Sequence, residues 1–90
     1  GGVKTLVFYT RARCHLCDEA KAAVLRVRAR APFELVLVDL DREASAEKLA
    51  AYTYEVPVGE LDGRKVFKYR VDEARLERLV REGVVEKGEA

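Results

Sequence analysis

The segment "RARCHLCDEA" (residues 11–20) contains both cysteines of this chain, Cys14 and Cys17, and its only histidine, His15. Two cysteines this close together serve thiol–disulfide exchange, metal or iron–sulfur ligation, or a structural disulfide. Structural zinc takes four cysteine or histidine ligands, and the chain has three such residues, so a metal site would need a second copy. A disulfide that closes so short a loop stabilises a fold only weakly. Redox chemistry is the preferred interpretation, with a dimer that binds zinc or an iron–sulfur cluster as the alternative.

The predicted local structure around the cysteines also favours thiol chemistry. Residues 3–10 are apolar and β-branched, as in a buried parallel strand, and residues 15–30 have apolar side chains at helical spacing. Cys14 falls where this helix begins, and unpaired backbone N–H groups and the helix dipole favour a thiolate there. Cys17 lies one turn further on, where we expect burial. The sequence predicts that Cys14 is exposed, has a lowered pKa and attacks disulfides, and that Cys17 resolves the mixed disulfide.

Basic residues gather around the two cysteines. Residues 11–31 contain six lysines and arginines but only two acidic residues, whereas the formal net charge of the whole chain is +1. We expect Arg11 and Arg13 to raise the electrostatic potential at Cys14. His15 either adds to this potential when charged or is simply solvated, and the second interpretation is favoured. All three are placed among the substrate-binding residues. The low net charge argues against a nucleic-acid-binding surface.

The rest of the chain alternates strand and helix patterns. Further elements are predicted at residues 33–39 (a strand buried on both faces), 41–54 (a helix), 56–70 (two strands) and 71–80 (a helix). Asp62-Gly63 predicts the hairpin turn between the last two strands, Asp72 an N-cap and Gly83 a helix end. The resulting order, β-α-β-α-β-β-α, is that of an α/β fold with a four-stranded mixed sheet and helices on both faces.

Some side chains within these elements have predicted places. Leu49 and Tyr52 are the inward candidates of the helix at residues 41–54, and Leu25 is expected to pack beneath a neighbouring helix. Gly59-Glu60 interrupts a strand that should be apolar and central. This interruption indicates either a short strand or a solvated sheet face.

The composition fits a single folded domain. Hydrophobic residues make up 49% and charged residues 37% of the chain, which is typical of a globular protein rather than a disordered one. No apolar run approaches the roughly 20 residues of a membrane span, and no signal peptide is recognisable, so we expect a cytoplasmic monomer without a membrane partner. We interpret residues 1–2 as a cloning remnant or trimmed end, 3–83 as the domain and 84–90 as a flexible tail. Asn, Gln and Met are absent, a bias typical of thermophiles, although a GC-rich genome would produce part of it as well.

Four segments together resemble the small bacterial glutaredoxin-like family of the thioredoxin-fold superfamily. They are "LVFYT", the Cys14-His15-Leu16-Cys17 motif, "VPV" at 56–58 and "DGRKVFKYRVDEARLERL", and the resemblance extends from about Val3 to Val80. It implies a thioredoxin/glutaredoxin-like fold and a thiol–disulfide oxidoreductase with a Cys14–Cys17 dithiol and no bound cofactor, active in cell redox homeostasis and electron transport. It also implies disulfide-containing proteins or glutathione mixed disulfides as substrates, and glutathione or a reductase as electron donor.

The resemblance further implies a cis peptide bond between Val56 and Pro57, facing the cysteines, with the Val56 backbone available to substrate. Standard glutaredoxins have Gly-Gly before the acidic residue that opens the last helix, where this chain has Tyr69-Arg70-Val71-Asp72. We place Arg70 and Asp72 among the substrate-binding residues, but the bulkier flanking residues predict that glutathione is at best a weak ligand. A thioredoxin-fold binding module without redox activity is a further alternative.

Overall fold

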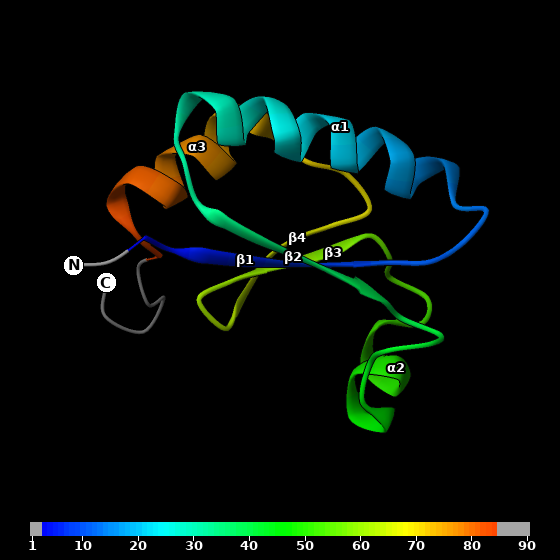
Figure 1. Ribbon diagram of the computed structural model, residues 1–90. Coiled ribbons are helices and arrows are strands. Elements are labelled where there is room, and N and C mark those ends of the chain that lie inside the picture. The colour runs from blue at the N-terminus through cyan, green and yellow to red at the C-terminus, as the bar shows by residue number, and fades with distance from the viewer. Residues whose placement is uncertain (1–2, 85–90) are drawn as a thin grey trace.

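The structure has the predicted order of elements. The computed structural model describes residues 3–84. Its strands and helices, in chain order, are β1 (Thr5–Thr10), α1 (His15–Arg30), β2 (Glu34–Asp39), α2 (Ala46–Tyr52), β3 (Val58–Leu61), β4 (Arg64–Lys68) and α3 (Glu73–Glu82). Helices α1 and α3 lie on one face of the sheet and the short α2 lies on the other (Figure 1). The predicted α/β fold with helices on both faces is therefore confirmed.

The four strands form one mixed sheet in the order β2-β1-β3-β4. β1 is parallel to β2 and antiparallel to β3, and β3 and β4 form the hairpin expected at Asp62-Gly63. Because β2 is an edge strand, the prediction that it is buried on both faces is wrong: Val36 and Leu37 are each 44% exposed. An apolar run of this length does not distinguish a central strand from an edge strand whose side chains are only partly covered.

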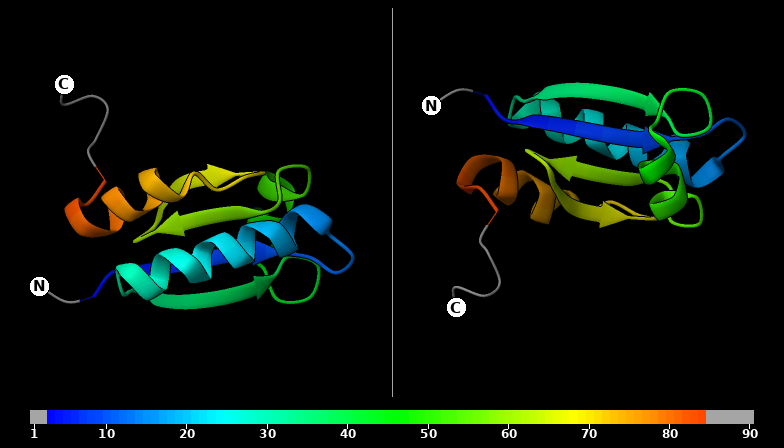
Figure 2. Two further views of the ribbon diagram at one scale, coloured as in Figure 1. Left: turned by 90° about the horizontal axis from the view of Figure 1, so that it is seen from above. Right: turned by 90° about the horizontal axis from the view of Figure 1, so that it is seen from below.

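The main core lies between the sheet and the helices α1 and α3. Its largest fully buried side chains include Leu6, Phe8, Val24, Val27 and Leu61. Helix α1 turns the predicted apolar stripe toward this core, and its C-cap is Ala31, just before Pro32. Figure 2 shows α1 and α3 side by side over the sheet from above, and the lone α2 on the opposite face from below.

The central strand β3 continues through Gly59-Glu60, although its pairing with β4 shifts register between these two residues. All four residues of β3 are buried. A Cβ atom at Gly59 would overlap the ring of Phe67, so the glycine lets this ring pack against the strand. Glu60 is only 6% exposed, and its carboxylate is bonded within the protein, as described below.

Two apolar residues lie outside the core, contrary to prediction. Leu25 and Leu49 are both exposed, whereas Tyr52 is buried as expected. Helix α2 is shorter than residues 41–54, because it begins only after Ser45, whose side-chain oxygen accepts a hydrogen bond from the Lys48 N–H.

The last helix has the predicted ends. Asp72 is its N-cap and accepts a 3.1 Å hydrogen bond from the Arg75 N–H, and Gly83, with a φ of 91°, is its C-cap. Val84 packs against the core, while the rest of the predicted tail lies outside the described residues. None of the helices in residues 3–84 is long and apolar enough to cross a membrane.

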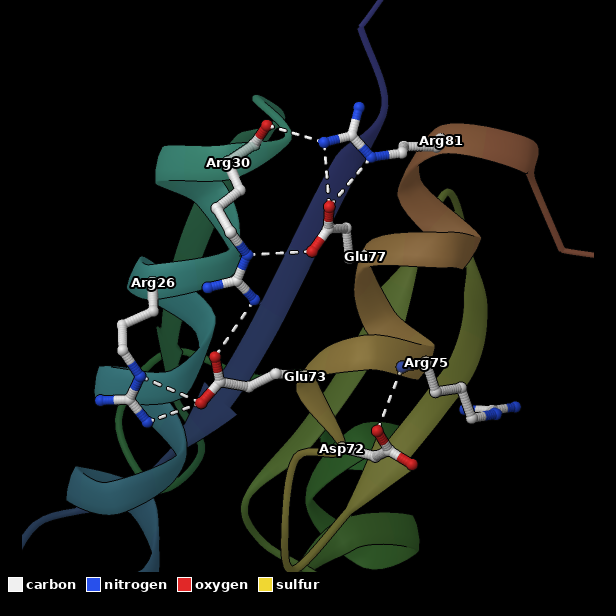
Figure 3. A network of polar contacts seen from close by, with 7 residues as sticks. All are labelled: Arg26, Arg30, Asp72, Glu73, Arg75, Glu77 and Arg81. Carbon is white, nitrogen blue, oxygen red and sulfur yellow. Dashed lines mark hydrogen bonds and ion pairs between the residues drawn. The ribbon is translucent and has the colours of Figure 1, made fainter.

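Charged side chains connect α3 to α1 along their exposed sides (Figure 3). Glu73 accepts from Arg26 at 2.7 Å and from Arg30 at 3.2 Å, and Glu77 accepts from Arg30 and Arg81, each at 2.9 Å. Hydrogen bonds from these arginines hold the pKa of both Glu73 and Glu77 below the usual range. Such exposed pairs stabilise a fold only weakly one by one, but this network fixes how the two helices lie against each other.

Candidate active site

The two cysteines form a disulfide where α1 begins. Cys14 is the N-cap residue, the Cα atoms of Cys14 and Cys17 are 5.1 Å apart, and the Cys17 N–H points at the Cys14 Sγ at 3.1 Å. Cys14 is partly exposed, whereas Cys17 is 1% exposed. A molecule arriving from solvent therefore meets Cys14 first, in agreement with the predicted exposure of the pair.

A short loop turns the chain from β1 into α1. Its residue Arg13 has a φ of 58°, in the left-handed region that non-glycine residues seldom adopt. Within residues 3–84 the Arg13 side chain has no hydrogen-bond or ion-pair partner. Arg13 is thus an exposed cation directly beside Cys14 in the chain.

The guanidinium of Arg11 is bonded within the protein, although it was expected to face substrate. It makes two hydrogen bonds to the Asp41 carboxylate, at 3.0 and 2.7 Å, and one each to the Thr53 carbonyl and hydroxyl, at 2.6 and 3.0 Å. The hydrogen bonding to Asp41 raises the pKa of Arg11, and the same interaction lowers the pKa of Asp41. Arg11 joins the loop before Cys14 to the end of α2.

His15 is also paired with a carboxylate. Its Nε2 lies 2.7 Å from the Glu19 Oε2, and its side chain is 85% exposed. Of the three basic residues expected to raise the potential at Cys14, Arg11 and His15 therefore have an acidic partner. The helix N-terminus and Arg13 are the features that remain to favour a negatively charged Cys14 sulfur.

The peptide bond between Val56 and Pro57 is cis, as the resemblance implied. Pro57 is buried, and its carbonyl accepts a 2.8 Å hydrogen bond from the Tyr69 N–H. This bond connects the cis-proline loop to the chain just before Arg70. The exposed Asp72 carboxylate, another expected substrate contact, caps α3.

A groove begins beside the dithiol and follows α1. We call it the side groove; it lies between residues 16–26 of α1 and residues 69–73, and its volume is about 410 Å³. Leu16, from between the two cysteines, lines it together with Arg70 and Val71. The structure thus brings one predicted substrate residue, Arg70, to the same hollow as the active-site motif.

Sequence analysis missed a buried polar cluster on the α2 face of the sheet. The Glu60 carboxylate accepts a 2.5 Å hydrogen bond from the Tyr52 hydroxyl and a 2.7 Å bond from Lys48 Nζ. Burial first, and then the bond to Glu60, raises the pKa of Tyr52 to about 12. The only signal in the sequence was a glutamate inside a predicted strand. The chain runs from α2 directly into the loop that contains the cis peptide bond before Pro57. The bonds from Lys48 and Tyr52 to Glu60 therefore hold α2, and with it the start of this loop, against the sheet.

We expect Tyr52→Phe to make the stability of the protein less sensitive to high pH. Between about pH 10 and pH 12 the folded protein keeps a phenol proton that the unfolded chain releases, because the pKa of Tyr52 is raised from 10.0 to about 12. The folded state binds more protons there, so the free energy of unfolding falls as pH rises, by up to about 3 kcal/mol for two pKa units. Urea unfolding at pH 8 and at pH 11.5 measures this difference.

At pH 8 the same substitution is expected to lower the free energy of unfolding by about 1–3 kcal/mol, because the buried Glu60 carboxylate loses a hydrogen-bond donor. Tyr54→Phe is the matched control, since the Tyr54 side chain is exposed. An equally steep alkaline loss in Tyr52→Phe and Tyr54→Phe would contradict the assignment to Tyr52.

Side chains near the two cysteines do not supply further ligands for a metal ion within the described part of the chain. Within residues 3–84, no group of three or more His, Cys, Asp and Glu side chains is placed to hold a metal ion. A metal or cluster at the two cysteines would need ligands from a second molecule.

Comparison with known proteins identifies relatives of this chain among glutaredoxin-like proteins. Residues 5–81 match the glutaredoxin-like domain family (DUF836). The "Glutaredoxin-like protein YDR286C homolog" of Dictyostelium discoideum is 34% identical over 73 residues, which cover 77% of this chain and 68% of that protein.

Solved structures with the same fold are also similar to this chain. The X-ray structure of the structural-genomics target XcR50 from X. campestris is 32% identical and covers 84% of this chain and 95% of its own, with a TM-score of 0.66. A mutant thioredoxin from Halobacterium salinarum is 22% identical, covers 92% of this chain and 78% of its own, and also has a TM-score of 0.66. The second likeness shows the thioredoxin-like fold.

Proposed function

This chain belongs to the glutaredoxin-like domain family, and on that basis we propose that it is a thiol–disulfide oxidoreductase whose Cys14 attacks disulfide substrates. The observation that carries the proposal is the asymmetry of the Cys14–Cys17 disulfide. One sulfur belongs to a partly exposed N-cap residue, and the other to a residue that is almost completely buried. Such a pair supplies one sulfur that meets substrate and one that acts only afterwards.

The reduced protein begins the cycle. The Cys14 thiolate attacks one sulfur of the substrate disulfide, the substrate S–S bond breaks, and the departing thiolate takes up a proton. Cys17 then loses its proton and attacks the Cys14 sulfur, which releases the second substrate thiol and forms the Cys14–Cys17 disulfide. Two electrons have passed to the substrate. A donor thiol system returns them, and glutathione or a reductase can fill that role.

The local structure favours this division of labour. The Cys17 N–H is directed at the Cys14 sulfur, and the beginning of α1 adds the positive end of a helix dipole. Both favour the negatively charged form of Cys14 that attacks the substrate disulfide. Its substrates in this proposal are disulfide-containing proteins and glutathione mixed disulfides in a cytoplasmic, reducing compartment.

We expect the purified protein to reduce hydroxyethyl disulfide with a rate proportional to protein concentration. Two coupled assays follow NADPH consumption, one with glutathione and glutathione reductase and one with thioredoxin reductase, and at least one of them should support turnover. A control without the protein gives the background. Background rates in both assays, from protein whose Cys14–Cys17 disulfide is demonstrably reducible, would argue against the proposal. Visible absorbance of anaerobically purified protein would instead favour an iron–sulfur cluster.

A further inference from the structure

We propose that the side groove binds the stretch of a protein substrate that flanks its reacting cysteine, and that it selects an apolar side chain next to a carboxylate. This inference rests on the proposed function and names the substrate class of the same site. It is carried by three observations: where the groove begins and ends, which of its charges are already paired, and how the loop that presents Arg70 is held.

The groove runs away from the dithiol along α1. It begins at Leu16, between the two cysteines, and reaches Arg26, so it follows ten residues of helix. At 1.5 Å per residue this is about 15 Å. An extended chain advances about 3.3 Å per residue, so about four residues of substrate fill the groove. At its far end Arg26 is joined to Glu73 across the space between α1 and α3 (Figure 3).

The floor of the groove is apolar. It is lined by Leu16, Ala20, Ala22 and Ala23 of α1 and by Val71. The hollow exists because the helix has small side chains here, and their methyl groups form no hydrogen bonds. Burying an aliphatic or aromatic side chain against such a surface lowers the free energy of binding, whereas a polar side chain finds no hydrogen-bond partner there.

Three of the four charged residues at the rim have a side-chain partner among residues 3–84. Glu19 pairs with His15, and Arg26 pairs with Glu73. Within the described part of the chain, the Arg70 side chain has neither a hydrogen bond nor an ion pair. The groove therefore presents an apolar floor and one guanidinium without a side-chain partner, which complements an apolar side chain with a carboxylate beside it.

The loop that carries Arg70 is held in an uncommon conformation. Tyr69 has a φ of 69°, and left-handed backbone is unfavourable for a residue with a Cβ. Two bonds hold it: the Tyr69 N–H donates to the Pro57 carbonyl at 2.8 Å, and its hydroxyl donates to the Tyr54 carbonyl at 3.3 Å. Strained residues that the surroundings enforce tend to lie at binding sites. Here the enforced turn fixes the point from which Arg70 extends.

These features suit a protein segment better than glutathione. Glutathione carries two carboxylates, whereas Arg70 is the one cation lining the groove that lacks a partner among the described residues. Arg11 is engaged by Asp41 and Thr53, and the exposed Arg13 does not line the groove. A polypeptide brings an apolar side chain for the floor and one carboxylate for Arg70. It also reaches the far end of the groove, which a tripeptide bound at Cys14 leaves empty.

The test uses mixed disulfides of cysteine peptides that carry Leu-Glu, Ser-Glu, Leu-Lys or Ser-Ser two to four residues from the cysteine. We expect kcat/KM of the wild-type protein to be at least tenfold higher for the Leu-Glu peptide than for the Ser-Ser peptide, through KM. Ala22→Trp, which fills the groove, should abolish the preference for Leu. Arg70→Glu should reverse the preference between Leu-Glu and Leu-Lys.

Ala29→Trp is the matched control, because Ala29 lies on the same helix outside the side groove and is exposed. It should keep the full preference for Leu-Glu. If the wild-type protein reduces hydroxyethyl disulfide but treats all four peptides alike, the groove proposal is overturned while the proposed function stands. If the wild-type protein reduces none of these disulfides, both are overturned.

Discussion

Cys14→Ser is expected to lower turnover of every disulfide substrate to the uncatalysed level, whereas Cys17→Ser is expected to stop after the first step and accumulate mixed disulfide. A serine hydroxyl stays protonated at neutral pH and does not attack sulfur, so the Cys14 variant cannot begin the cycle. In the Cys17 variant the partly exposed Cys14 still reacts, but no second thiol in the chain can release the substrate.

Intact-protein mass spectrometry after incubation with a glutathione or peptide mixed disulfide distinguishes the two variants. The Cys17→Ser protein should gain the mass of one substrate half, and the Cys14→Ser protein should gain none. A reducing agent should remove the added mass. Ala29→Ser, at an exposed position of α1 outside the side groove, provides a control that also introduces a serine and should cycle normally. Adducts of equal yield on Cys14→Ser and Cys17→Ser would show that the exposed and buried cysteines have no distinct roles.

Much of the fold was predictable because its signals are local. The alternation of apolar runs with a helical stripe gave the order of elements, Asp62-Gly63 gave the hairpin, and Asp72 gave the start of α3. Each of these depends on a few neighbouring residues: a turn needs residues that adopt its dihedral angles, and an N-cap needs a side-chain acceptor. The position of Cys14 at the start of α1 followed from the same kind of reasoning.

Features set by contacts between distant segments were not predictable. The edge position of β2 depends on which strands pair, and nothing within residues 33–39 specifies a partner. Glu60 is tolerated inside the sheet because Lys48 and Tyr52 approach from α2. These contacts arise only once the chain has folded, so a charged residue in a strand could be interpreted only as an interruption.

The candidate site shows the same division. Its two cysteines follow from type and spacing, whereas the cis peptide before Pro57 came from family resemblance alone. The side groove is lined by α1 and by Arg70, so it depends on how the loop between β4 and α3 lies relative to that helix. The basic residues before Cys14 were expected to act through their charge, but the charge of Arg11 is neutralised by an aspartate 30 residues away.

Arg11→Ala is expected to lower both stability and the rate of disulfide reduction. Arg11 makes four hydrogen bonds that join the loop before Cys14 to Asp41 and to Thr53, and Thr53 lies four residues before Pro57. Its removal leaves the Thr53 carbonyl without this donor and frees the two sides of the active site to shift. We expect a loss of about 1–3 kcal/mol in the free energy of unfolding, from the lost hydrogen bonds to a charged group. For kcat/KM we expect a decrease of about tenfold, because small misplacements of reacting groups slow catalysis.

Two further variants separate positioning from charge. Arg11→Lys keeps the positive charge but has a single ammonium in place of the planar fork, so it should recover only a small part of the lost rate. Asp41→Asn should reproduce part of the defect, and the double variant Arg11→Ala with Asp41→Asn should fall short of the sum, because both changes break the same bridge. Arg42→Ala, an exposed arginine next to Asp41 in the chain, should behave like the wild-type protein. Full activity in Arg11→Lys would mean that Arg11 acts through its charge at Cys14 and that the bridge is dispensable.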